Sequence, residues 1–288
     1  KGIAEGLNYG LGFMVIFMLH FTVATKQPAM TAARFAEAVE KTPQGKTVNM
    51  KLAQLLVDVF RSQSIAVLGN VLIAMGLAAL IAFGYQYKTG EPLMNADQIA
   101  YQLHSIDPFA GTLWFAAIAG VWLFCSGIIS GYFDNRSNYL NMRMRLAQHP
   151  LLKKLMSEKT RVKFANYMHE NYGSLIGNFC FGMLLGLTGL VGYLTHLPLD
   201  IRHVAFSSAN VGYIAVSGHF TYSLLLQCIA FVLLIGLVNL IVSFSLTLWV
   251  ALRSLNAEID SWWLIWHEVC QIVRKRPLSL FFPVQLDK

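Results

Sequence analysis

Five long stretches of the chain contain no charged side chain, and this feature limits the possible folds more than any other. They cover residues 6–25, 62–87, 108–133, 171–199 and 220–252. An α-helix rises 1.5 Å per residue, so about 20 residues cross about 30 Å of hydrocarbon. Only 13% of all residues are charged, against about 25% in soluble domains. The pattern predicts a polytopic helical membrane protein.

The predicted fold class is all-α, with five transmembrane helices, cytoplasmic helical extensions and an amphipathic C-terminal helix. The spans are expected near residues 6–25, 62–85, 109–133, 173–195 and 221–251. The predicted domains are a transmembrane helical domain, 1–252, and a cytoplasmic amphipathic tail, 253–288. The first run is interpreted as a span and not as a signal peptide, because it is long and no small-residue cleavage site follows it.

The number of lysine and arginine residues alternates between low and high in the successive segments that flank the uncharged runs. Before, between and after the five runs they number one, six, one, eight, one and five. Short loops rich in Lys and Arg stay in the cytoplasm. The N-terminus of this chain is therefore expected in the periplasm and its C-terminus in the cytoplasm. The net charge of +7 then reflects topology and attraction to anionic headgroups, so membrane lipids are the expected partners and nucleic acid is not.

The two basic segments are themselves expected to be helical. In the first, we predict a helix with Thr31 as its N-cap and another from Asn49 that continues into the second span. The second, 135–170, predicts a helix broken near His149-Pro150. These segments are interpreted as extensions of membrane helices.

The tail carries an apolar stripe at helical spacing, which predicts an amphipathic helix ended by Pro277 and followed by an extended apolar strip. The stripe consists of Leu255, Ile259, Trp262, Trp266, Val269 and Val273, widened by Trp263. Indole rings suit a membrane interface. The three tryptophans Trp262, Trp263 and Trp266 are expected either on the inner leaflet or against a protein partner or an upstream cytoplasmic domain.

Spans two and four share a spaced pattern. Each holds a Gly-Asn pair, ending at Asn70 and Asn178, and a Gly-Tyr pair at the same interval, ending at Tyr85 and Tyr193. The pattern suggests a parallel duplication of a helical hairpin.

Several polar residues inside or beside the runs are candidate functional positions. They are Asn70, Asn178, Asn239, His20, Asp134, Arg136, Arg202 and His203. For the asparagines, the alternatives are a polar path or headgroup site and plain hydrogen bonding between helices. Asp134 ends a span, where a cationic partner is expected. The span cores contain no Asp or Glu, which argues against a proton-coupled transporter.

Residues 199–218 are small, nearly uncharged and too few to cross a membrane. Two alternatives remain open for them, a half-helix that re-enters the membrane and a helix or strand on its outer surface.

No motif for catalysis or cofactor binding occurs in the sequence. Phosphate loops, GxSxG and HExxH are absent, and Cys125, Cys180, Cys228 and Cys270 form no CxxC pair. No catalytic residue, cofactor or metal site is expected, and the thiols are expected to be isolated.

The stretch LNYGLGFMVIFMLHFTVATKQPAMTAA resembles a family of proteobacterial inner-membrane proteins named site-specific recombinases, of the Gcr type. GNVLIAMG, PLDIRHVAFSS and RKRPLSLFFPV are similar to it as well, so the resemblance covers essentially the whole chain. It implies a multi-pass protein of the bacterial inner membrane, with a helical cytoplasmic region and a further span upstream of Lys1.

The recombinase chemistry itself is not visible in these residues. A tyrosine recombinase uses a spaced Arg, a His-x-x-Arg and a nucleophilic Tyr, and Arg202-His203 does not match this arrangement. We expect a non-enzymatic inner-membrane component that handles lipids or small molecules or anchors a larger assembly. The alternatives are a DNA recombination accessory protein, as the family name suggests, and a channel or transporter.

Overall fold

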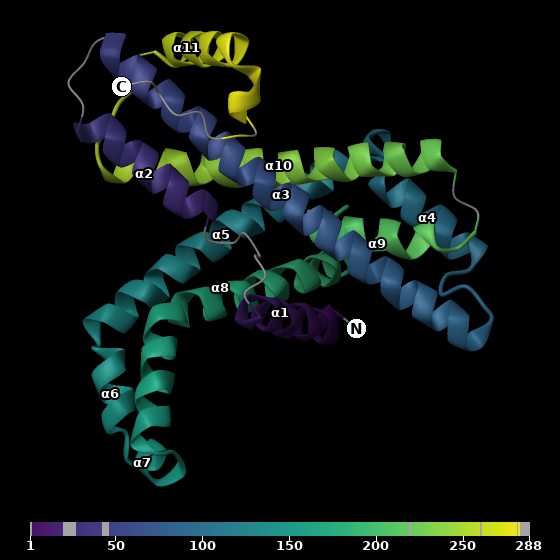
Figure 1. The fold of residues 1–288 in the computed structure, drawn as a ribbon, viewed down its shortest axis with the longest axis horizontal. Helices are drawn as coiled ribbons and strands as arrows, with labels where there is room; N and C mark the ends of the chain where they lie inside the picture. Colours follow the sequence, from purple (N-terminus) through teal and green to yellow (C-terminus); the bar gives the residue numbers. More distant parts are fainter. Residues whose placement is uncertain are drawn as a thin grey trace. The chain divides into compact units, whose positions relative to one another are not determined.

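The structure, a computed structural model, describes residues 2–19, 27–41, 46–218, 221–259, 261–280 and 282. These residues form helices and connecting segments, with no β-strand among them (Figure 1). The all-α prediction is confirmed. In chain order the helices are α1 (Gly2–Met18), α2 (Gln27–Lys41), α3 (Lys46–Thr89), α4 (Ala96–Ile106), η1 (Pro108–Ala110), α5 (Thr112–Tyr139), α6 (Met142–Gln148), α7 (Pro150–Leu155), α8 (Glu158–Thr195), α9 (Val204–Ala215), α10 (Tyr222–Ser254), α11 (Trp262–Lys275) and η2 (Pro277–Leu280).

Four helices among the described residues are long and apolar enough to cross a membrane, namely α3, α5, α8 and α10. They coincide with the second to fifth predicted spans. The first predicted span, 6–25, overlaps α1, an apolar helix of 17 residues. Residues 20–25 of that span lie outside the described residues.

The basic segments follow their predicted pattern, with two corrections. The helix expected from Asn49 does continue into the second span, as the single helix α3. α6 ends at Gln148 and α7 starts at Pro150, so the break at His149-Pro150 is confirmed. Thr31 is not an N-cap, because α2 begins at Gln27. Proline is well tolerated in a first helical turn, so Pro28 does not delay the start. A second break, before Ser157, the N-cap of α8, is absent from the prediction.

The tail helix is shorter than predicted. α11 begins at Trp262, with the Ser261 hydroxyl accepting a hydrogen bond from the Leu264 backbone N–H at 3.4 Å. Leu255 and Ile259 therefore precede the helix, because the side-chain cap at Ser261 sets its start. After Pro277 the chain forms the short turn η2 and not the expected extended strip.

The chain folds into two compact units, and each is built from two separate stretches of sequence. Unit 1 comprises Lys1–Ala29 and Trp122–Asp200, and unit 2 comprises Met30–Val121 and Ile201–Lys288. The tail helix α11 belongs to unit 2 together with α3 and α10. The division into a transmembrane domain, 1–252, and a cytoplasmic tail, 253–288, stays a prediction.

In unit 1, α1 lies along α8 (Figure 1). A Cβ added at Gly182 would overlap the backbone of Gly10, and one at Gly186 would overlap Gly6. Only glycine allows such close approach, as is common between membrane helices. α5 and α8 also meet through polar groups: the Ser130 hydroxyl donates to the Gly173 carbonyl at 2.6 Å.

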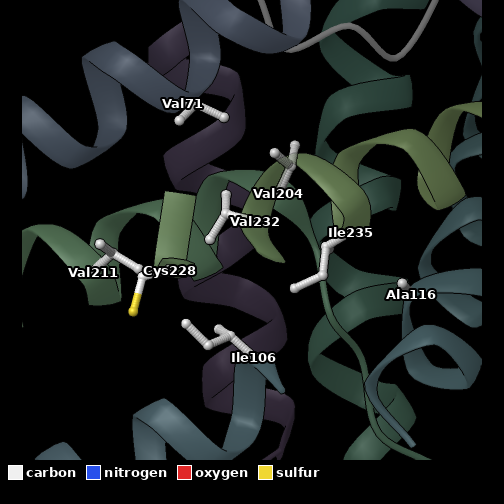
Figure 2. Close-up of a cluster of buried hydrophobic side chains, with 8 residues drawn as sticks. All are labelled: Val71, Ile106, Ala116, Val204, Val211, Cys228, Val232 and Ile235. Atoms are coloured by element: carbon white, nitrogen blue, oxygen red, sulfur yellow. The ribbon is translucent and has the colours of Figure 1, made fainter. Parts of the chain in front are cut away.

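In unit 2, the half-length helix α9 lies along α3 and against α10. A Cβ at Gly212 of α9 would overlap the carbonyl oxygen of Met75 in α3. Figure 2 shows a cluster of buried apolar side chains in this unit, which come from α3, α4, α5, α9 and α10. They are Val71, Ile106, Ala116, Val204, Val211, Cys228, Val232 and Ile235.

Candidate functional site

A pocket of about 450 Å³ opens between α3, α10 and α11 in unit 2. Its walls are almost entirely apolar and aromatic. α3 contributes Leu56, Val57, Val59, Phe60 and Gln63, α10 contributes Leu237, Leu240, Ile241, Phe244, Ser245 and Leu248, α11 contributes Trp262, Trp266 and Val269, and η2 contributes Leu280. Small-molecule sites in proteins are typically about 300–1,000 Å³ and mainly hydrophobic, with a few polar groups.

The tail helix α11 closes one side of this pocket, and a second core cluster holds it in place. Ile265 is fully buried and packs in a cluster with Phe35, Leu52 and Leu248. The Trp262 ring stacks on Phe35 with centroids 6.3 Å apart. Ile265, which the predicted stripe does not include, therefore lies at the centre of the buried face. The predicted stripe residues Trp262 and Trp266 line the pocket instead.

Gln63 is the one deeply buried polar side chain among the described residues of the pocket wall. Its side chain is 2% exposed, and its Nε2 has no hydrogen-bond partner within the described part of the chain. A buried amide donor without a partner costs about 1–3 kcal/mol. The described residues that line the pocket include no Asp, Glu, Lys, Arg or His. A bound molecule is thus offered an apolar and aromatic wall whose polar side chains, Gln63 and Ser245 beside the indoles of Trp262 and Trp266, are all uncharged.

A second polar centre lies at the N-terminal end of α9, where three of the predicted residues meet. The Asn239 Oδ1 accepts a hydrogen bond from the Val204 backbone N–H at 3.1 Å. The Asn239 Nδ2 donates to the carbonyl oxygens of Ala116 at 2.7 Å and of Arg202 at 3.0 Å. Asn239 is 3% exposed, so this amide joins α10, α5 and the start of α9 in the interior.

Arg202 is fixed by the backbone and by an aromatic ring. Its Nε donates to the Ser105 carbonyl at 2.7 Å, and its guanidinium carbon lies 5.4 Å from the Phe115 ring centroid. His203 is 5% exposed, and its ring lies 5.8 Å from that of Phe206. The sequence places Arg202 and His203 between the fourth and fifth predicted spans, in the segment 199–218 for which it leaves two alternatives open. In the structure they adjoin Asn239, close to the middle of the long apolar helix α10.

The remaining predicted residues lie elsewhere. Asn178 is fully buried in α8 and donates to the Ser174 carbonyl at 2.9 Å, and Asn70 is half-buried in α3. The Asp134 Oδ1 accepts from the Gly173 backbone N–H at 3.1 Å. Arg136 is exposed and donates to the Tyr132 hydroxyl at 3.4 Å. His20 lies outside the described residues.

One pair in unit 1 has the spacing of a nucleophile and its base. The Ser137 Oγ lies 3.0 Å from the His169 Nδ1. Ser137 is fully buried, however, and its hydroxyl also lies 3.3 Å from the His169 carbonyl oxygen. A nucleophile must reach its substrate, so this pair is better described as a structural contact between α5 and α8.

Sequence reasoning missed Gln63 and Glu268. Gln63 is the second residue of an uncharged run, where a polar side chain is expected at the interface. Glu268 is only 9% exposed, although it does not belong to the predicted apolar stripe of the tail helix. Glu268 follows Ile265 by three residues, about one helical turn. An apolar residue at 265 is therefore the sequence signal that places Glu268 on the buried face. Gln63 has no local signal, because its burial depends on α10 and α11.

The comparisons with known proteins identify a family but no solved fold. A family model described as Site-specific recombinase matches residues 1–283. Neither the curated proteins nor the solved structures contain a match. The resemblance noted from the sequence is confirmed. Because the match covers nearly the whole chain, this helical protein, with its apolar pocket and its buried polar centre, belongs to the site-specific recombinase family.

Proposed function

We propose that this protein is a non-enzymatic component of the bacterial inner membrane that binds a lipid-like molecule in the pocket between α3, α10 and α11. The observation that carries the proposal is the pocket itself, about 450 Å³ with an apolar and aromatic wall. Burying hydrocarbon in such a space is favourable by about 0.8 kcal/mol per CH₂ group. An acyl or isoprenoid chain is the matching chemistry.

The position of the pocket on long apolar helices supports this proposal. The α10 side of the wall, Leu237 to Leu248, belongs to the C-terminal half of the helix, which carries Arg253 in its last turn. In the orientation favoured by the Lys and Arg counts, that half faces the cytoplasm. Trp263, 77% exposed beside the pocket, then lies at the headgroup level, where indole rings are enriched. Lipid chains reach the pocket directly from the inner leaflet.

The polar centre around Asn239 supports a related proposal about topology. Residues 199–218 re-enter the membrane, and α9 forms the returning half-helix. Non-helical backbone at membrane depth is tolerated only where protein satisfies it. Asn239 and Arg202 supply such contacts at the start of α9.

A photo-crosslinking experiment tests lipid binding. The protein is placed in lipid discs that contain a phosphatidylcholine with a diazirine in one acyl chain, and the labelled peptides are mapped. We expect labels to concentrate on 56–63, 237–248 and 262–269. Ser245 lines the pocket and is exposed, so S245W should fill the opening and reduce this labelling several-fold.

The matched control is S223W, at an exposed serine near the other end of the same helix. It should leave the labelling of the pocket peptides unchanged. The proposal would be refuted if the labels were spread over all lipid-exposed peptides and S245W did not change the labelling of the pocket peptides.

A second candidate function, a DNA recombination accessory, is favoured by the family name and by one basic surface in unit 1. This basic hairpin consists of α6, α7 and the first turns of α8. Its exposed cations are Arg143, Arg145, Lys153, Lys154, Lys159 and Lys163. Arg161 ties the hairpin together by donating from Nε to the Ala147 carbonyl at 2.7 Å.

A gel-shift titration against duplex DNA tests this candidate. Binding through the hairpin should weaken steeply with salt, because each phosphate contact releases counterions. The double variant K153E/K154E should lower the salt dependence, while R253E, outside the hairpin, should not. A complete absence of a shift at low salt would exclude the candidate.

A further inference from the structure

We propose that the pocket selects an uncharged lipid with a carbonyl oxygen, which accepts a hydrogen bond from the Gln63 amide. An esterified acyl chain and an isoprenoid quinone both have this chemistry. The inference rests on the proposed function and names its ligand class.

Burial and hydrogen bonding of Gln63 carry the inference. The side chain is 2% exposed, lines the pocket, and has no partner for its Nε2 among the described residues. Nearly all buried donors in proteins have a partner. Gln54, earlier on α3, shows the usual state: its Nε2 donates to the Asp58 Oδ1 at 3.2 Å. The Nε2 itself is shielded from solvent, so the proposal requires the amide to turn toward the pocket, where a ligand oxygen becomes the partner that the described part of the protein does not supply.

The pocket wall also determines the charge of the ligand. Its described residues include no cation to pair with a carboxylate or phosphate. Burying an unpaired anion is strongly unfavourable. The basic side chain next to Gln63 along α3, Arg61, pairs with Asp58 at 2.9 Å and donates to the Ser279 carbonyl at 3.4 Å. An uncharged acceptor fits this wall, and a pure hydrocarbon leaves the amide without a partner.

Competition against the photo-crosslinking lipid tests the inference. The competitors are methyl oleate, 1-octadecene, oleate and decylubiquinone, which present an ester, no acceptor, a carboxylate and a quinone. In the wild-type protein, methyl oleate should compete about tenfold better than 1-octadecene, which corresponds to one hydrogen bond. Decylubiquinone then shows whether the ester or the quinone is preferred. At pH 9 oleate is ionised, and it should compete less well than methyl oleate because the described pocket wall has no cation to pair with its carboxylate.

The decisive variant is Q63M, an apolar side chain of similar length that suits a helix. It should bind 1-octadecene as well as the wild type does and lose the tenfold preference for methyl oleate. The matched control, Q54M, lies outside the pocket wall and should keep that preference. The inference fails if Q63M retains the wild-type ratio, or if oleate competes as well as its ester. If no competitor reduces labelling in the wild type, the proposed lipid pocket itself fails.

Discussion

One helix contact in each unit shows the contrast between close and open packing. In unit 1, glycines let α1 and α8 approach until their backbones touch, as at Gly182 and Gly10. In unit 2, α3, α10 and α11 meet through Trp, Phe and Leu side chains, which hold the helices apart and leave a pocket of about 450 Å³. Small residues thus allow membrane helices to pack in direct contact, whereas large side chains keep helices apart and can leave a pocket between them. Three substitutions test this contrast.

The largest effect is expected from G182L in unit 1. A side chain there overlaps the backbone of Gly10, and backbone cannot move aside as a flexible side chain can. Overpacking of this kind typically costs about 1–3 kcal/mol and at times more, and we expect the upper end. Thermal unfolding in detergent, followed by circular dichroism, should show a strong loss of stability.

The matched control for G182L is G189L. A Cβ at Gly189, on the same helix, meets nothing within 4 Å. This variant should unfold at nearly the wild-type temperature. Equal destabilisation by both variants would mean that leucine itself, and not the contact between α1 and α8, is responsible.

An intermediate effect is expected from N239L in unit 2. The substitution removes the acceptor for the Val204 N–H and the donor to the Ala116 and Arg202 carbonyls. Leaving such groups buried without a partner costs about 2 kcal/mol. Thermal unfolding should reveal the loss, and hydrogen exchange should increase at the start of α9.

The comparison variant for N239L is N70L. Asn70 is half-buried, and its side chain makes no hydrogen bond to another described residue. Leucine is favourable in an apolar helix, so N70L should be neutral or slightly stabilising. A loss equal to that of N239L would show that Asn70 has a role which its position in α3 does not explain.

The smallest effect on stability is expected from S245W, the variant that fills the pocket. A tryptophan in this position enters existing space, so the free energy of unfolding should stay within the range of about 0.5 kcal/mol seen for surface changes. Thermal unfolding in the same detergent measures it. The result sharpens the contrast with G182L, because both replace a small residue by a large one. A severe loss of stability in S245W would mean that the pocket cannot accept a ligand of that bulk.

Much of the secondary structure could be predicted from local patterns. Long uncharged runs predict α3, α5, α8 and α10, and the His149-Pro150 pair predicts the break between α6 and α7. Helix ends are less predictable. The tail helix starts at Trp262 and not near Leu255, because a capping hydroxyl at Ser261 outweighs the apolar periodicity.

The candidate site could be predicted only in part. The sequence indicates that the tail tryptophans form an unusual surface, and it marks Arg202, His203 and Asn239 as separate polar positions. Their meeting point is a product of tertiary packing, since 35 residues separate Val204 from Asn239 in the sequence. Gln63 is not among the predicted positions, because a single glutamine at the start of an apolar run has no distinguishing pattern.

The sequence by itself determined that this chain is helical and apolar enough for a membrane, because charge-free runs and prolines act locally along the backbone. The tertiary structure alone decided which side chains face one another. It buried Gln63 in a pocket, placed Arg202 beside Asn239 and brought Gly10 against Gly182. Those contacts depend on the angles and distances between helices, and no periodicity within a single helix encodes them.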